Sequence, residues 1–272
     1  MLGKLKRSFK KHILNRISPE NMLFLIHLKE KKKDYFPFKR SVFVEKEPPV
    51  NSRILVLSPH PDDEVLGPGG TLYRYGKAGN EIMVVYMTDG SGSTPGADAD
   101  KMKQTRLEEA GKIGETYHFT QKFLDYKDGA LEVSENTIKT LKNIIIEFKP
   151  HRIFLPSFLD SHKDHITTNH ILYSVLKDSP NLEAEIFGYE VWTNIPFPNY
   201  AINITDDFET KLQMISVYQS QTAMFDYEQL CRSRNSLNHT MYLDNGARGF
   251  TEIFLHFSSH AYVHIMSPLV SS

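Results

Sequence analysis

Hydrophobic residues along this chain form short continuous runs that alternate with longer stretches of helical period. Continuous runs are typical of strands buried on both faces of a sheet, and the longer stretches are typical of amphipathic helices. The predicted strands are residues 54–57, 81–87, 118–119, 153–156 and 186–191. The predicted helices lie between them, at residues 66–77, 99–113, 135–148 and 165–176. This alternation predicts an α/β fold with a Rossmann-like, mostly parallel sheet and helices on both faces.

Two clusters of histidine and acidic residues each follow a predicted strand. SPHPDDE at residues 58–64 follows the strand at 54–57, and DSHKDH at 160–165 follows the strand at 153–156. Ligands of open α/β sheets bind beyond the carboxyl ends of the strands, so both clusters are expected at that edge. Alone, the first cluster could be an acidic, solvated turn. Together, the clusters would repel one another without a cation, which predicts a divalent metal with zinc-type ligands.

The order of these motifs resembles that of the PIG-L/LmbE-type zinc-dependent N-acetylglucosamine deacetylases. The first cluster supplies PHPDDE and the second supplies HKDH. Five further segments continue the resemblance, namely TDG at 88–90, RLEEA at 106–110, YKDG at 126–129, YQSQ at 218–221 and RGFTEIF at 248–254. The resemblance extends from about residue 53 to residue 257 and leaves residues 1–50 outside.

The resemblance implies roles for five residues. His60, Asp63 and His165 would bind zinc, or another divalent metal, and leave one coordination position for water. Asp62 would be the general base that takes a proton from this water. His162, in its protonated form, would stabilise the oxyanion of the tetrahedral intermediate. The implied reaction is hydrolysis of the N-acetyl group of an N-acetylated amino sugar or its conjugate.

Two acidic neighbours of these residues are expected to support the site. Glu64 is expected to be a structural partner in a hydrogen-bond network rather than a ligand. Asp164 is expected either to orient His162 or His165 as an outer carboxylate or to face solvent.

Several further residues can be interpreted either as part of the site or as structural. Asp89 ends the strand at 81–87 and is expected to shape the pocket rather than only a turn. Arg106 could reach a substrate hydroxyl or phosphate, or form a surface ion pair. Trp192 is expected in the core or at the wall of the site, and the sequence alone does not support sugar stacking. Three late histidines lie among aromatic and β-branched residues, which favours strands and a structural role for His256, His260 and His264.

Two other classes of function stay open. A different metallohydrolase, such as a phosphoesterase, would bind phosphate through Arg106 and would be favoured by two metals, whereas the sequence offers clear ligands for one. A non-catalytic relative would bind glycans or partners only, but all five motif residues are present. A dinucleotide enzyme is disfavoured because no GxGxxG follows the first strand.

Composition is that of an ordinary globular protein, with 272 residues, 40% hydrophobic and 24% charged. The expected organisation is a basic amphipathic extension at residues 1–50 and one catalytic domain at 51–272. Cys231 is the only cysteine, so no intramolecular disulfide can form. No signal-peptide pattern is present and the early apolar run at 22–26 is too short to span a bilayer, so a cytoplasmic location is expected.

Residues 1–40 hold twelve Lys and Arg against three Asp and Glu, although the net charge of the chain is −1. Within this segment Leu5, Phe9 and Ile13 fall on one helical face, with lysines and arginines elsewhere. Such a helix can lie on an anionic membrane surface, which would make the protein membrane-peripheral. Alternatively, its apolar face packs on the catalytic domain or on a partner subunit of a homo-oligomer. Nucleic acid is not an expected partner, because no aromatic platform accompanies the charge.

Overall fold

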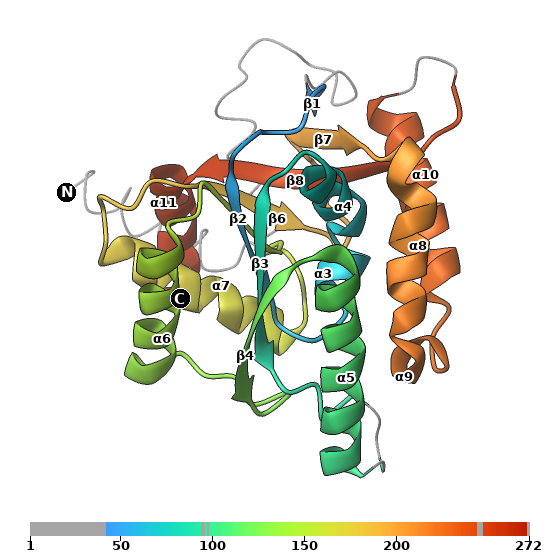
Figure 1. Ribbon diagram of the computed structural model, residues 1–272. Coiled ribbons are helices and arrows are strands. Elements are labelled where there is room, and N and C mark those ends of the chain that lie inside the picture. The colour runs from blue at the N-terminus through green and yellow to red at the C-terminus, as the bar shows by residue number, and fades with distance from the viewer. Residues whose placement is uncertain (1–41, 94–95, 97, 244–246, 271–272) are drawn as a thin grey trace, which may run out of the picture.

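The computed structural model describes residues 42–93, 96, 98–243 and 247–270. This part of the chain forms an eight-stranded sheet with the strand order β1-β7-β8-β6-β5-β2-β3-β4 (Figure 1). The strands are β1 (Phe43–Glu45), β2 (Arg53–Ser58), β3 (Glu81–Thr88), β4 (Thr120–Tyr126), β5 (Arg152–Pro156), β6 (Glu185–Tyr189), β7 (Tyr200–Asn203) and β8 (Thr251–Ser258). Neighbours are parallel, except that β8 is antiparallel to both β6 and β7.

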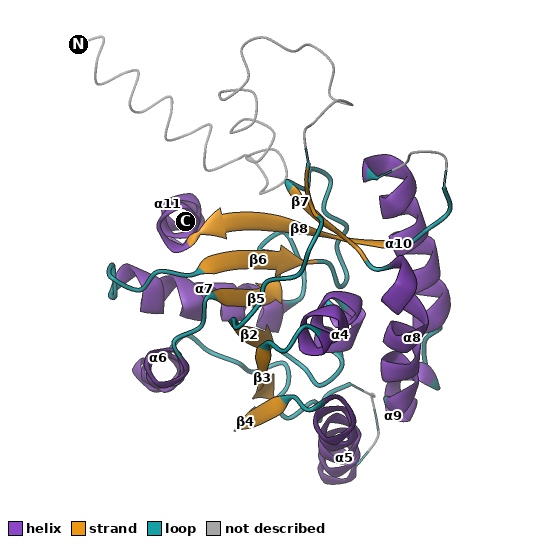
Figure 2. Ribbon diagram, turned by 45° about the horizontal axis from the view of Figure 1, so that its top comes forward, coloured by secondary structure: helices purple, strands orange, loops and turns teal. Residues whose placement is uncertain are grey.

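Helices cover both faces of the sheet (Figure 2), which confirms the predicted α/β class. On one face lie α3 (Asp63–Leu66), α4 (Gly69–Lys77), α5 (Ala99–Tyr117), α8 (Phe208–Val217), α9 (Gln219–Thr222) and α10 (Tyr227–Tyr242). On the other lie α6 (Glu135–Phe148), α7 (Lys163–Lys177) and α11 (Ser259–Val270).

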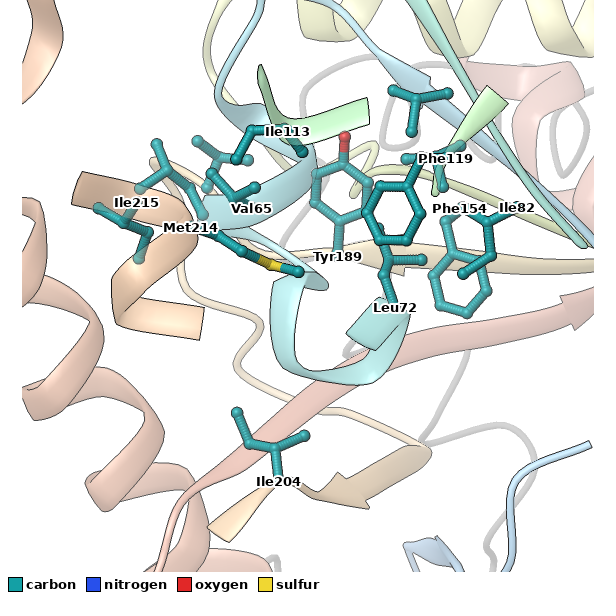
Figure 3. Packing of buried hydrophobic residues seen from close by; sticks show 14 of the residues in the cluster. Val65, Leu72, Ile82, Ile113, Phe119, Phe154, Tyr189, Ile204, Met214 and Ile215 are labelled. Carbon is teal, nitrogen blue, oxygen red and sulfur yellow. The ribbon is translucent and has the colours of Figure 1, made fainter. Parts of the chain in front are cut away.

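The core consists of two main layers, one on each side of the sheet. Along β2, Ile54 and Val56 belong to one hydrophobic cluster, and Leu55 and Leu57 belong to the other. All four are fully buried, as expected for a parallel strand with helices on both faces. Figure 3 shows part of the first cluster, in which aromatic side chains of the strands lie beside aliphatic side chains of α3, α4, α5 and α8.

The predicted helix at 66–77 corresponds to α4, which begins three residues later, at Gly69, because the chain turns at Gly67 and Pro68 after a short preceding helix, α3. A Cβ atom at Gly67 would lie 2.2 Å from Cδ2 of Tyr189, so only glycine fits. The strand predicted at 118–119 begins later, at Thr120. His118 instead ends α5 in a left-handed conformation, with φ of 58°.

The late histidines do not all lie in strands. His256 is in β8 as predicted, but His260 and His264 are in α11, so the strand prediction there was wrong. The aromatic residue of this segment, Tyr262, is 1% exposed and donates from its hydroxyl to Oδ1 of Asn169 on α7 at 2.8 Å. Burial against α7 therefore outweighs the local preference for strand.

β1 precedes residue 51, the expected start of the catalytic domain, yet it is a strand of the same sheet. Phe43 pairs with Tyr200 of β7 in parallel register. Glu45 is buried, and its Oε2 accepts from Nη1 of Arg152 at 2.7 Å and from the hydroxyl of Tyr200 at 2.6 Å. The sheet therefore includes residues that lie outside the family resemblance.

Candidate metal centre

The two His/Asp clusters meet at one edge of the sheet. β2 and β5 are adjacent parallel strands, with Ile54 opposite Arg152, so both end on the same side. The first cluster leads from β2 into α3, and the second leads from β5 into α7. His60, Asp63 and His165 are all buried there. The structure thus brings together potential ligands that lie up to 105 residues apart in the chain.

Three donor atoms form a small triangle. Asp63 Oδ2 lies 3.1 Å from His60 Nδ1 and 3.2 Å from His165 Nε2, and the two nitrogens lie 3.4 Å apart. Four-coordinate zinc with bonds of about 2.0–2.2 Å holds its ligand atoms roughly 3.3–3.6 Å apart. The donors therefore already have nearly the spacing that a tetrahedral metal requires, and two imidazoles with one carboxylate suit a divalent cation.

The electrostatics of the triangle also favour positive charge. Burial alone would lower the pKa of His165, but the charge of Asp63 and the contact with Asp160 raise it to about 9. Burial alone would raise the pKa of Asp63, but the charge of His165 and the hydrogen bonds with His165 and His60 together lower it. The donor set thus fits a divalent metal by its charge as well as by its geometry.

Outer carboxylates orient both imidazoles. His60 Nε2 lies 3.2 Å from Asp164 Oδ2 and 3.4 Å from Asp128 Oδ1, and His165 Nδ1 lies 3.4 Å from Asp160 Oδ1. With protons on His60 Nε2 and His165 Nδ1, the other ring nitrogens, His60 Nδ1 and His165 Nε2, are available as ligand atoms. This is the usual arrangement around metal-binding histidines. Within the described residues, His60 also belongs to two further groups of potential ligands, one with His162 and His165 and one with Asp128 and Asp164. The carboxylate of Asp164 therefore contacts His60, not His162 or His165.

His162 lies beside the triangle and caps α7. Its Nδ1 accepts from the backbone N–H of Asp164 at 3.2 Å, so the neutral ring carries its proton on Nε2. Its ring centroid lies 4.6 Å from that of His60 and 4.9 Å from that of His165. Burial, together with charge on these two rings, lowers the pKa of His162. The neutral form is favoured, whereas the resemblance implied a protonated ring.

Asp62 has a strained backbone, with φ of 128° and ψ of −25°. This region costs a non-glycine residue about 1–3 kcal/mol and is found mostly at functional sites. Asp62 Oδ2 lies 3.0 Å from Nη2 of Arg106. Burial and the nearby charges of Asp63 and Glu64 raise the pKa of Asp62 to about 7, although Arg106 opposes them. A carboxyl group that titrates near neutrality can both accept and release a proton.

Glu64 fixes the backbone of Asp62. Its Oε2 accepts from the backbone N–H of Asp62 at 3.0 Å. Its Oε1 accepts from the hydroxyls of Tyr86, at 3.1 Å, and Tyr218. The carboxylate and both tyrosines are at most 1% exposed. These contacts give Glu64 a place in a buried hydrogen-bond network, and they help to hold Asp62 in its strained conformation.

Arg106 and Asp89 also hold parts of the site in place through their contacts. Arg106 is 2% exposed and donates to the backbone carbonyl before Asp62 as well as contacting the Asp62 carboxylate. It is therefore part of a buried ion pair rather than a surface one. Asp89 Oδ1 accepts from the backbone N–H groups of Ser91 at 3.0 Å and Asp128 at 3.1 Å. Asp89 thus connects the loops that follow β3 and β4.

Three residues near the site, Asp128, Asp160 and Tyr218, lie in the motifs described above but had no predicted role of their own. Asp128 and Asp160 follow β4 and β5, and that position was a usable signal. Tyr218 lies 154 residues from Glu64, and no local pattern connects the two. Trp192, expected in the core or at the wall of the site, is 45% exposed, and its backbone N–H donates to Asp160 Oδ2 at 3.0 Å.

The basic amino-terminal segment lies outside the described residues, which begin at residue 42. Its contact with a membrane, with the catalytic domain or with a partner subunit therefore stays a prediction. Among the helices that the structure does describe, none is long and apolar enough to cross a bilayer.

Comparison with known proteins identifies related sequences and folds. The profile of the PIG-L family, described as GlcNAc-PI de-N-acetylase, matches residues 55–176. Diacetylchitobiose deacetylase from Thermococcus kodakarensis is 25% identical over 191 residues, covering 62% of this chain and 70% of that protein. N,N'-diacetylchitobiose deacetylase from Pyrococcus horikoshii has a similar structure, with a TM-score of 0.66 and 26% identity over 78% of this chain and 85% of that chain.

The fold also occurs in a protein named for different chemistry. The 4-carboxy-2-hydroxymuconate hydratase GalB from Pseudomonas putida KT2440 has a TM-score of 0.62 at 18% identity, covering 75% of this chain and 95% of that chain. The fold alone therefore does not define the reaction. The profile match, by contrast, runs from β2 to α7 and spans both His/Asp clusters. The resemblance seen in the motifs is confirmed, because residues 55–176 match the PIG-L family.

Proposed function

We propose that this protein is a metal-dependent deacetylase that removes the N-acetyl group of an N-acetylated amino sugar or its conjugate, with zinc as the metal. The triangle formed by donor atoms of His60, Asp63 and His165 beside the buried carboxyl group of Asp62 is the main support. Similarity to two diacetylchitobiose deacetylases supports an N-acetylated sugar as the substrate class.

In the proposed reaction, His60, Asp63 and His165 would hold the metal, which when bound would polarise the amide carbonyl and acidify water. Asp62 takes a proton from water as the water oxygen attacks the carbonyl carbon. The Nε2–H of His162 donates to the carbonyl oxygen as negative charge develops there. Asp62 then delivers its proton to the amide nitrogen, the C–N bond breaks, and acetate and a free amine are released.

The alternatives from the sequence have less support. A phosphoesterase would need Arg106 to bind phosphate, but this guanidinium is buried and paired with Asp62. A relative that only binds glycans has no need for a proton acceptor beside three metal donors. We also propose that the catalytic domain begins at β1 rather than at residue 51, because Glu45 is buried against Arg152.

Three single variants test the proposal. Asp62→Asn should retain the metal and lose most turnover, because the ligands remain and the proton acceptor does not. His165→Ala should lose both, and Asp178→Asn, an exposed change at the end of α7, should lose neither. Acetate release from N-acetylglucosamine and its disaccharide, with elemental analysis of the purified proteins, gives both readouts. An Asp62→Asn variant as active as the parent would refute Asp62 as the base.

A further inference from the structure

An aromatic cluster lies partly exposed near the metal donors. Trp192, in the loop after β6, is 45% exposed, and Phe225, in the turn between α9 and α10, is 47% exposed. Their ring centroids lie 6.1 Å apart. Tyr227 completes the cluster, 6.1 Å from Trp192 and 5.1 Å from Phe225. Neighbouring aromatic side chains that stay half exposed in a folded protein are typical of a binding surface.

A hydrogen bond joins this cluster to the site. The backbone N–H of Trp192 donates to Asp160, whose other carboxylate oxygen lies 3.4 Å from Nδ1 of His165. The same loop is held by α10, the helix that begins with Tyr227, because Nη2 of Arg234 donates to the backbone carbonyl of Val191 at 2.5 Å. The loop that carries Trp192 therefore lies between the proposed metal ligands and α10.

The surroundings of the cluster suit a sugar ring. The C–H face of a pyranose is apolar and can pack on an indole, while the hydroxyls at its rim need polar partners. Asn194 and Asp226 are exposed in the same two loops as Trp192 and Phe225. A cavity of about 450 Å³ adjoins Phe225, and its lining combines polar residues such as Ser216, Asp226 and Glu228 with apolar ones such as Leu212 and Met224. A mixed lining of this kind matches the apolar face and polar rim of a pyranose.

We infer that the cluster of Trp192, Phe225 and Tyr227 binds a second pyranose ring, joined to the ring that carries the reacting N-acetyl group. This inference rests on the proposed deacetylase function and narrows its substrate to glycans of two or more rings. Stacking of the second ring on Trp192 would strengthen the binding of a disaccharide, whereas a monosaccharide has no second ring to stack.

Kinetics with matched substrates test the inference. Trp192→Ala should lower kcat/KM for N,N'-diacetylchitobiose about tenfold and change that for N-acetylglucosamine less than about twofold. Leu237→Ala, which removes another exposed apolar side chain from α10, should change neither. Equal effects of Trp192→Ala on both sugars would overturn the inference. A loss confined to an octyl glycoside of N-acetylglucosamine would also overturn it, since the cluster would then bind an apolar aglycone.

Tryptophan fluorescence can test binding of the second ring independently of the proposed reaction. Trp192 is the only tryptophan of the chain, so its emission reports on this surface alone. In the Asp62→Asn variant, saturating disaccharide should shift or quench the emission, whereas N-acetylglucosamine should leave it nearly unchanged. Acetate release without any change in emission would refute the second-ring site and keep the deacetylase. A change in emission without acetate release from the parent protein would refute the deacetylase and keep the sugar site.

Discussion

The strained backbone of Asp62 makes an unusual stability prediction. Replacing alanine by glycine normally destabilises a protein, by about 0.4–1 kcal/mol where the native φ suits both, because glycine gains more freedom in the unfolded chain. At φ of 128° the Cβ atom instead costs about 1–3 kcal/mol. Asp62→Gly should therefore be more stable than Asp62→Ala, by about 1.5 kcal/mol. Both variants lack the carboxylate and its contact with Arg106, so these losses cancel in the comparison.

The assay is thermal unfolding of the two variants without metal, because bound metal would stabilise them unequally. A difference of about 1.5 kcal/mol corresponds to roughly 3–6 °C in Tm for a protein of this size. Lys112, exposed within α5, provides the control, because there alanine should be more stable than glycine by about 1 kcal/mol. An Asp62→Ala variant more stable than Asp62→Gly, as expected at Lys112, would show that the backbone at this position is not strained.

Three other changes should have measurable effects. Gly67→Ala should destabilise the fold by about 1–3 kcal/mol in denaturant titrations, because its Cβ would collide with the ring of Tyr189, and a neutral effect would contradict the close approach. Lys211→Met should cost about 3–5 kcal/mol, because it leaves the buried Glu252 carboxylate, 2.6 Å from Nζ, without its cation. Adding Glu252→Gln should recover part of that loss, and no recovery would argue against the pair. Burial raises the pKa of Glu190, so the native state binds this proton more tightly than the unfolded chain, and stability should fall as pH rises above about 4.3. Glu190→Gln should flatten that slope, and an unchanged slope would exclude Glu190 as its source.

The elements best predicted from the sequence are those whose signals are local. The helix at 135–148 has the same bounds in the structure, where Ser134 caps it through the backbone N–H of Thr137. The strands at 54–57 and 81–87 also match, because they are apolar on both faces. β4 lies at an edge of the sheet and is mostly half-exposed, so it has no apolar run to detect. The requirement for glycine at position 67 depends on the ring of Tyr189, which is far away in sequence.

In the candidate site, too, local sequence signals were predicted and contacts between distant residues were not. The two clusters were visible because each is short and follows a strand. The outer contacts were not, since the Asp164 carboxylate reaches His60 across 104 residues and could not be assigned by sequence proximity to His162. The protonation of His162 also depends on neighbours that the fold supplies, because charge on His60 and His165 helps lower its pKa.

The pairing of β1 with β7 also has a consequence for the order of folding. Glu45 and its partner Tyr200 are 155 residues apart, and His60 and His165 are 105 apart. During synthesis β1 leaves the ribosome early but has no partner strand until β7 follows, so the edge must close late, after β2 and β5 have met. Metal uptake should therefore begin in nascent chains that have released α7 and still lack β7. Ribosome-bound chains of increasing length would reveal that order through their metal content.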